Sequence, residues 1–496
     1  MAGRSLKTLL CFFFLVAVTP FPAAFSAEAP SGKDPEQVHV LSLVDCLNIA
    51  LDNSFEVKMA RLDLLIAETD LMYSNAVFDT VLFGNIGYTE DKRQELSVFS
   101  ADDDQVNVYS AGISKKLPSG TEVSAVLTDT RYWDNSGFIS KNPSHNAELQ
   151  FEARQPIGKN FFGYADRAGV TMTALAVKNS DLASRDRIEQ LLADTALSYT
   201  DLLFAKRSLD IYSDIYDRAE KLYGSIKKNY QIGISEKVDL LAAEANLANR
   251  KADLIIARNS YRDAMESLKL IMNLGEDVRI LPEEGLSFEP LKAELSDCLE
   301  KAFRYRRDYR INKRDLEIRG IDLKVKKNAL WPEIDLVGTF SMNGLEKDFS
   351  KAISKTTVAD NTYYFGGVEF SWPLENRAAR ALSRKASREK EKAVLAIKRT
   401  ERRIITQVGI AYEDTVAYGA GREFTRRAMG LQSEKLEEEE KNFLHGRSGT
   451  KRLIDYQQDL LFSELEDARA LLNHRKAKVE LFRKMNIILE NFEEVL

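Results

Sequence analysis

Proline is missing from two long stretches of the chain, residues 157–281 and 374–496. Because proline breaks helices, these stretches are free to form helices far longer than the usual ~12 residues. One apolar series recurs there every seven residues, and a second follows three residues on: Leu240, Leu247, Leu254, Tyr261 and Leu268, then Ala243, Ala257, Ala264 and Ile271. This period, broken only at Arg250, predicts helices that pack nearly parallel over a long distance.

Cysteine and histidine are scarce, with three and four copies in 496 residues. The histidines show no metal-ligand spacing: His39, His145, His445 and His474. The chain also has no glycine-rich phosphate loop and no nucleophile motif. We therefore expect no metal, no cofactor and no enzyme activity.

Cys46 and Cys298 each lie in an Asp-Cys-Leu context. They could form a disulfide in an oxidising compartment. However, they occupy the same place in two halves of an internal repeat, and such positions usually lie apart in space. Two buried, unpaired thiols are therefore the favoured interpretation.

Positive charge is not in excess, since the formal net charge is −6. Removal of Arg4 and Lys7 with an N-terminal leader would bring it to −8. A chain this acidic is not expected to bind nucleic acid.

Long apolar runs are absent apart from Leu9–Val16, which follows Arg4 and Lys7 and precedes Pro20. This pattern predicts a cleaved secretory signal peptide over residues 1–26. A retained membrane anchor is the alternative, but the run is too short to span a bilayer. If the mature chain enters a membrane, we expect it to do so as strands.

The sequence contains an internal repeat. Leu41–Leu51 resembles Ala293–Phe303, and each is followed by an amphipathic helical pattern that ends in Asn-Ala-x-(Phe/Trp), at Asn75–Phe78 and Asn328–Trp331. Pro282 and Pro290 lie between the halves and indicate a linker. The predicted units are the signal peptide (1–26), a first structural repeat (27–272), an inter-repeat linker at the equator of the molecule (273–294) and a second structural repeat (295–496).

After the first helix of each repeat, apolar residues recur at every second position, which indicates β-strands. Ala147–Arg154 alternates without a slip, and Val368–Trp372 does so before Pro373. Aromatic residues lie in or beside the strand segments, as in the girdles of membrane β-barrels: Trp133, Trp331, Trp372, Tyr132, Tyr164, Tyr363 and Tyr364. The strands are too few to close a sheet from one chain, so we expect an oligomer to complete a shared barrel.

The first repeat has a hairpin that the second lacks, Val106–Lys116 and Thr121–Arg131 around a turn at 117–120. The acidic run Asp102–Asp104 and the stretch 134–145 are predicted as exposed polar loops. The acidic run could bind calcium, but a solvated loop is favoured.

Two turns with the pattern Asn-(Tyr/Phe)-x-x-Gly-x-Ser interrupt the helical stretches once each, at Asn229–Ser235 and Asn442–Ser448. Each glycine is predicted to take the left-handed conformation that ends a helix. Each serine, two residues later, is predicted to cap the next helix. The run Glu437–Glu440 before the second turn is predicted as a solvated helix face.

Length matching predicts how the helices stack. Each long helix would extend ~100 Å, each returning helix would be ~40 Å shorter, and the helix before the strands would add ~35 Å. The predicted bounds are 166–231, 236–273 and 55–77 in the first repeat, and 378–444, 450–486 and 308–330 in the second. Two short helices stacked end to end therefore match one long helix, which favours a hollow cylinder over a compact bundle.

In this order and duplicated, these motifs resemble the TolC family of outer-membrane efflux proteins, over Leu41–Met485. The resemblance implies an α+β fold and a homotrimer. Long antiparallel helical hairpins would form an α-barrel in the periplasm, and the strands would form a shared transmembrane β-barrel in outer-membrane lipid. The family barrel takes four strands per chain, whereas six are predicted here.

The resemblance further implies an exit duct for tripartite efflux or type I secretion, served by an inner-membrane pump. A periplasmic adaptor (membrane-fusion) protein would dock on the two tips: Ile232, Gly233, Ile234 and Ser235, and His445, Gly446, Arg447 and Ser448. His445 and Arg447 replace the aliphatic residues of the family motif. A periplasmic structural or adaptor-type coiled-coil protein without a pore is the alternative, which the alternating strand at 147–154 disfavours.

For the periplasmic gate, the resemblance matches Asp455 to one ring of aspartates that narrows the entrance. Arg452 replaces the aspartate of the other ring. Asp239 matches a latch aspartate, with Arg447 or Arg452 as candidate partner. An ordinary solvated aspartate is the alternative for Asp455.

Overall fold

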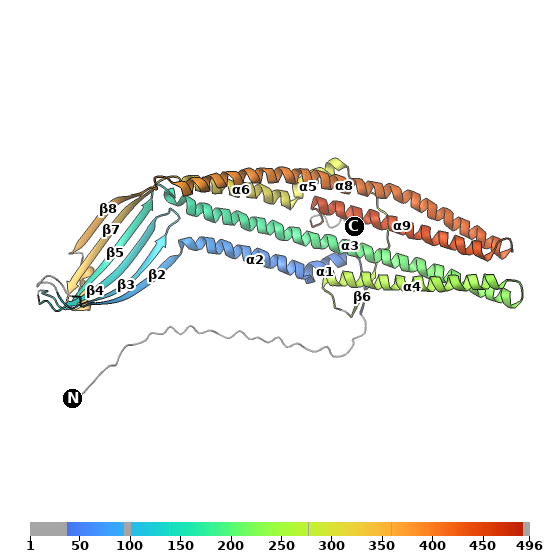
Figure 1. Cartoon of the computed structure of the whole chain (residues 1–496), viewed down its shortest axis with the longest axis horizontal. Helices are drawn as coiled ribbons and strands as arrows, with labels where there is room; N and C mark the ends of the chain where they lie inside the picture. The colour runs from blue at the N-terminus through green and yellow to red at the C-terminus, as the bar shows by residue number, and fades with distance from the viewer. Residues whose placement is uncertain (1–36, 94–100, 138, 276, 359, 490–496) are drawn as a thin grey trace, which may run out of the picture.

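A computed structural model describes residues 37–93, 101–137, 139–275, 277–358 and 360–489. A twisted sheet forms one end of the elongated molecule, and long helices run from it to two turns at the opposite end (Figure 1). The predicted signal peptide, residues 1–26, lies outside the described residues. No helix in the described ranges is both long and apolar enough to cross a membrane.

Six strands form the large sheet, in the order β2-β3-β4-β5-β7-β8, and every neighbouring pair is antiparallel. Their bounds are β2 Thr80–Asp91, β3 Asp104–Lys116, β4 Glu122–Asp134, β5 Ser144–Pro156, β7 Glu333–Glu346 and β8 Thr362–Ser371. The extra hairpin of the first repeat is therefore confirmed as β3 and β4. Asp104 belongs to β3 rather than to the predicted loop, because it pairs with Asp91 and Asp134.

The helices differ greatly in length. Their bounds are α1 Leu43–Asn53, α2 Phe55–Asn75, α3 Tyr164–Gln231, α4 Lys237–Met272, α5 Leu295–Tyr305, α6 Arg307–Asn328, α7 Phe349–Thr356, α8 Arg377–Leu444 and α9 Thr450–Met485. Short 3-10 turns lie at Ala76–Phe78 and Phe161–Gly163. Helices α3 and α8 have 68 residues each, so each extends about 100 Å.

The predicted stacking of the short helices is confirmed. Helices α2 and α4 both contact α3 and lie end to end along it, and α6 and α9 do the same along α8 (Figure 1). Contacts of α3 with α6 and α9 join the two halves side by side. The apolar seam of α4 is buried or half-buried along its whole length, including Leu254, Tyr261 and Leu268.

The main apolar core lies at the equator, where short helices α1 and α5 meet the middle of α3 and α8 and the ends of α4 and α9. Cys46 and Cys298 are both buried in it and both unpaired, as predicted. Burial, with the nearby Asp45 and Glu284 charges, raises the pKa of the Cys46 thiol to about 12. These thiols therefore serve as small apolar side chains.

One equatorial element was not predicted. Strand β6, Val278–Pro282, lies within the predicted linker and pairs in parallel with β1, Gln37–Leu41. The Tyr199 hydroxyl of α3 donates to Leu41 O at 3.1 Å and also to Glu284. The linker is thus fixed to the N-terminal segment rather than simply wrapped around the helices.

Candidate functional site

The two turns at the ends of the hairpins have the same backbone geometry. In the first, Gly233 N–H donates to Tyr230 O at 3.0 Å and Ile234 N–H to Asn229 O at 2.8 Å. The second repeats this pattern, and Gly233 and Gly446 have φ values of +80° and +68°. This pair of bonds is the Schellman motif, which favours glycine at the left-handed position. The predicted role of both glycines is confirmed.

The predicted role of the two serines is wrong. Helix α4 is capped by Glu236 and helix α9 by Gly449, and neither cap makes a side-chain hydrogen bond to its helix. Ser235 therefore lies one residue too early to cap. The Ser448 hydroxyl instead donates to the Glu439 carboxylate on α8.

The first tip exposes aliphatic side chains. Ile232 and Ile234 are 69% and 73% exposed, and Val238, in the first turn of α4, is 72% exposed. The second tip exposes His445 and Arg447 at the equivalent positions, with Leu444 beside them. Within the described chain nothing covers either set, so one tip presents an apolar surface and the other a basic one.

Glu439 ties the second tip to its hairpin. It is 7% exposed, accepts the Ser448 hydroxyl and lies 3.8 Å from Arg452 Nε. The predicted solvated face at Glu437–Glu440 is therefore wrong at Glu439. The buried Leu436, three residues earlier, places Glu439 on the packed face of α8, and this spacing was the signal in the sequence.

The predicted gate residues lie in the first two turns of the returning helices. Asp455 and Arg452 are exposed on α9, and Asp239 is half-buried on α4. Within the described chain, Asp239 forms no ion pair with Arg447 or Arg452, and Arg452 pairs with Glu439 instead. A single chain thus brings Arg452 to Glu439 and leaves the Asp239 and Asp455 carboxylates unpaired.

The large sheet has one apolar and one polar face. On β5, Ala147, Leu149 and Phe151 point to one face, and the register places Leu149 between Leu127 and Met342. Phe151 lies beside Phe340, with ring centroids 6.3 Å apart. The apolar face thus continues across neighbouring strands, as in a sheet with lipid on one side.

The opposite face of the sheet carries Glu148, Gln150, Glu152 and Arg154 on β5. Arg154 pairs with Asp335 at 3.2 Å and with Glu369, on the two following strands. Strands that alternate in this way separate an apolar environment from a polar one. Exposed aromatic side chains lie beside the sheet on its helical side, at Trp331 and Trp372.

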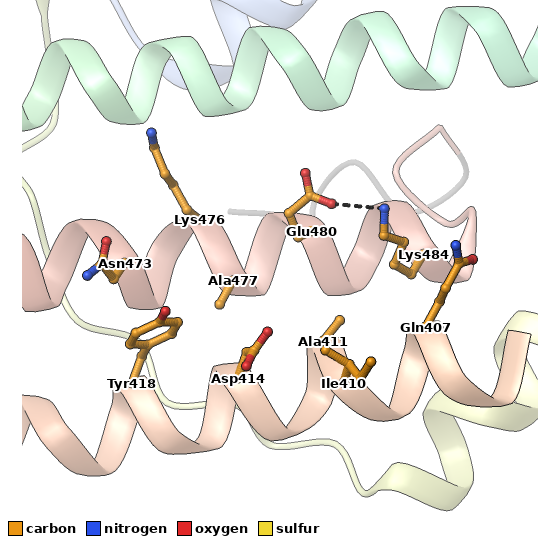
Figure 2. Close-up of a pocket in the computed structure, with 10 residues that line it drawn as sticks. All are labelled: Gln407, Ile410, Ala411, Asp414, Tyr418, Asn473, Lys476, Ala477, Glu480 and Lys484. Carbon is orange, nitrogen blue, oxygen red and sulfur yellow. Dashed lines mark ion pairs between the residues drawn. The ribbon is translucent and has the colours of Figure 1, made fainter. Parts of the chain in front are cut away.

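A cavity of about 340 Å³ lies between α8 and α9 near the equator (Figure 2). Its lining includes Ile410, Asp414 and Tyr418 from α8. On α9, Glu480 pairs with Lys484 at 3.3 Å, and Lys476 pairs with Asp201 of α3 at 2.6 Å. Three of the charged residues that line the cavity are therefore already paired, and the pair of Lys476 joins α9 to α3. No group of metal-ligating side chains occurs among the described residues.

Three comparisons bear on the identity of the chain. Residues 120–274 match the family model described as outer membrane efflux protein. No curated protein matches.

Solved structures share the fold over nearly the whole chain. The structure of CusC is 14% identical, with a TM-score of 0.68, and the match covers 94% of this chain and 97% of CusC. The CmeC outer membrane channel of Campylobacter jejuni is 13% identical, with a TM-score of 0.67 and coverage of 91% and 89%. The open-state MtrE outer membrane channel of Neisseria gonorrhoeae is 16% identical, with a TM-score of 0.66 and coverage of 90% and 88%.

These structures have the same combination of sheet and long helices at low sequence identity, and so they show the fold alone. The family match covers β4, β5, α3 and α4, and so includes the first tip. Over these residues the chain is similar to the outer membrane efflux protein family, the TolC family.

Proposed function

We propose that this protein is the outer-membrane exit duct of a tripartite efflux or type I secretion system. The observation that carries the proposal is a sheet with one apolar and one polar face, joined directly to helices about 100 Å long. A sheet of this kind suits a membrane, and helices of this length suit a passage through the periplasm. Substrates would pass from an inner-membrane pump to the outside.

Three copies would complete the barrel. Strands β2 and β8 form the two edges of the sheet, and both expose large apolar side chains, such as Ile86 at 81% and Tyr364 at 73%. With six strands per chain the edges run in opposite directions, so β2 of one copy can pair antiparallel with β8 of the next. A trimer would then have eighteen strands, a number compatible with an aqueous lumen.

The two repeats, 27–272 and 295–496 with the linker 273–294, would each supply one hairpin to a helical cylinder. The exposed aliphatic residues of the first tip, Ile232 and Ile234, support docking of a periplasmic adaptor there. Gly233 and Ser235, and His445, Gly446, Arg447 and Ser448 of the second tip, would belong to the same docking surface.

Asp455, Arg452 and Asp239 would form the periplasmic gate. Three Asp455 carboxylates around a threefold axis would repel one another and favour cations. Because Arg452 lies one turn from Asp455 and pairs with Glu439, the gate would carry both signs of charge.

A coiled-coil scaffold without a pore is the second candidate function. The long hairpins support it, since they could serve as spacers. The apolar face of the sheet argues against it, because a scaffold gains nothing from an apolar surface of this extent.

Single-channel conductance of the purified protein in planar lipid bilayers tests the duct. We expect small, cation-selective currents in the wild type. Asp455→Asn should reduce the cation selectivity, and Arg452→Ala should increase it by removing a positive charge near the ring. A protein that inserts but carries no current under any of these conditions would contradict the proposal and favour the scaffold.

A further inference from the structure

Helix α7, which joins β7 to β8, lies on the apolar face of the large sheet. It packs on β7 and β5 at the end of the sheet farthest from the long helices (Figure 1). Ala147 of β5 and Gly344 of β7 are paired neighbours that share this face with Leu149, and Ala147 is fully buried. A side chain added at Gly344 would collide with the carbonyl oxygen of Ala352, so the backbone of α7 lies directly against the strand. Two small residues therefore fix α7 to the side of the sheet that the proposed duct turns towards lipid.

The apolar face of the sheet changes its chemistry at the level of α7. Towards the long helices, this face of β5 carries apolar side chains such as Leu149. At the level of Ala147, the neighbouring residue of β4 is Asp129, and the next residue of β5 on this face is His145. The Nδ1 atom of His145 lies 2.8 Å from Asp129 Oδ2, and its ring centroid lies 5.8 Å from that of Phe349 on α7. Because the outward face of a membrane strand becomes polar where the hydrocarbon ends, α7 lies at the boundary between lipid and water.

The outer surface of α7 stays uncovered when copies of the chain join. The two free edges of the sheet are β2 and β8, whereas α7 packs on β5 and β7. Pairing of those edges between copies adds strands beyond β8 and places no strand over α7. The exposed side chains of α7 are Phe349, Ser350, Lys351, Ser354 and Lys355. They are therefore free to contact whatever surrounds the sheet at this level.

Basic side chains outnumber the acidic side chains that pair with them around α7. Four lysines lie on or beside the helix: Lys141, Lys347, Lys351 and Lys355. Lys141 and Lys355 share the carboxylate of Glu346, and Lys351 pairs with Asp348 at 3.0 Å. Lys347 is exposed and forms no ion pair with any described residue. Four positive charges thus face two negative ones, which leaves a surface that favours anions.

We propose that α7 is an interfacial helix that lies in the outer surface of the membrane and binds anionic lipid headgroups through its lysines. The proposal rests on the proposed duct, which places this face of the sheet in lipid, and it names a lipid partner for that face. Helices that combine apolar and basic side chains lie in the headgroup region of a bilayer. Phe349, which is 49% exposed, would reach the acyl chains. The stems of the lysines would lie along the same surface, and their ammonium groups would reach the phosphates.

Quenching by brominated lipid tests whether α7 contacts the membrane. Ser354 is exposed on the side of α7 opposite the buried Ala352, so Ser354→Trp places a fluorophore where we expect lipid. The background is the full chain in which phenylalanine replaces its own tryptophans: Trp133, Trp331 and Trp372. In vesicles of brominated phosphatidylcholine, the new tryptophan should lose most of its fluorescence. Glu148→Trp is the matched control, because it lies on β5 beside Ala147 but on the polar face, and it should keep its fluorescence.

The same tryptophan measures the preference for anionic headgroups. Brominated phosphatidylglycerol, diluted into unbrominated phosphatidylcholine, should quench it at a lower mole fraction than brominated phosphatidylcholine does. Adding Lys347→Ala should reduce this preference about fivefold, the effect of one lysine near an anionic surface. High salt should reduce it as well. Lys227→Ala is the matched control, since it removes an exposed lysine of α3 near the first tip, and it should change nothing.

Each other outcome rejects a defined part of the reasoning. Fluorescence of Ser354→Trp that stays unquenched in a protein that conducts would overturn the proposal and leave the duct standing, with α7 covered by water or by protein. Equal quenching by the two lipids, or a preference that Lys347→Ala leaves unchanged, would overturn the binding of anionic headgroups. Absence of conductance in the wild type would reject the duct itself.

Discussion

The buried ion pair between Glu189 of α3 and Arg307 of α6 holds the two halves of the molecule together at the equator. The side chains are 0% and 3% exposed. Glu189 also accepts the Ile488 N–H at 3.1 Å, so its carboxylate is linked to the end of the described chain as well. Burial raises the pKa of Glu189, and the Arg307 guanidinium opposes that shift.

Arg307→Met should destabilise the protein severely. The substitution leaves a buried carboxylate without its cation, which costs about 3–5 kcal/mol. Removing both charges in Glu189→Leu with Arg307→Met should cost much less, because apolar side chains of similar volume can replace a buried pair. What remains are the groups that lose Glu189 as a partner, the Ile488 N–H and the Asn486 side chain, at about 1–3 kcal/mol for each buried group left unsatisfied.

The effect of Arg307→Met should also depend on pH. Without Arg307, the pKa of the buried Glu189 rises further, so the folded state binds a proton that the unfolded state releases at neutral pH. A raised folded-state pKa gives stability that is present at low pH and lost as the pH rises. The variant should therefore recover part of its lost stability as the pH falls below neutral.

Urea unfolding in detergent, followed by far-ultraviolet circular dichroism, measures these differences. Arg187→Met is the matched control, because Arg187 forms an exposed pair with Asp63 between α3 and α2, with side chains 50% and 48% exposed. Exposed pairs contribute about 0–1 kcal/mol. The reasoning fails if Arg307→Met costs no more than Arg187→Met, or if the double variant is as unstable as the single one.

Three smaller predictions concern the tips and the thiols. Gly233→Ala places a side chain at φ +80°, so we expect the free energy of the local turn to rise by about 1–2 kcal/mol. Amide hydrogen exchange should become faster at the first tip alone. Unchanged exchange would argue against the left-handed turn. Glu439→Gln keeps the shape of the side chain but weakens its hydrogen bond with the Ser448 hydroxyl. The rate of amide hydrogen exchange at the second tip should therefore rise. An unaltered rate would mean that this hydrogen bond does not stabilise the tip. Burial raises the pKa of the Cys46 thiol to about 12 and also raises that of the Cys298 thiol. A maleimide near neutral pH should therefore label neither cysteine until urea is added. Labelling of the folded protein would contradict this expectation.

The bounds of the long helices could be predicted because their signals are local. Long segments without proline became α3 and α8, the segment with the seven-residue period became α4, and the tip glycines ended each long helix where expected. Where the next helix begins was not predictable from Ser235 and Ser448, because tertiary packing rather than capping decides how the chain re-enters the hairpin. The burial of Glu439 could have been predicted, because its spacing from Leu436 places it on the packed face of α8.

By itself, the sequence determined the repeat, the lengths of the helices, the alternation of the strands and the two turns, because each depends on residues close together in the chain. Only the tertiary structure decided that Gln37–Leu41 pairs with Val278–Pro282 and that Glu189 meets Arg307. These contacts join segments more than a hundred residues apart. Their energy comes from burial and charge pairing that exist only after the helices have been brought together, so no local pattern encodes them.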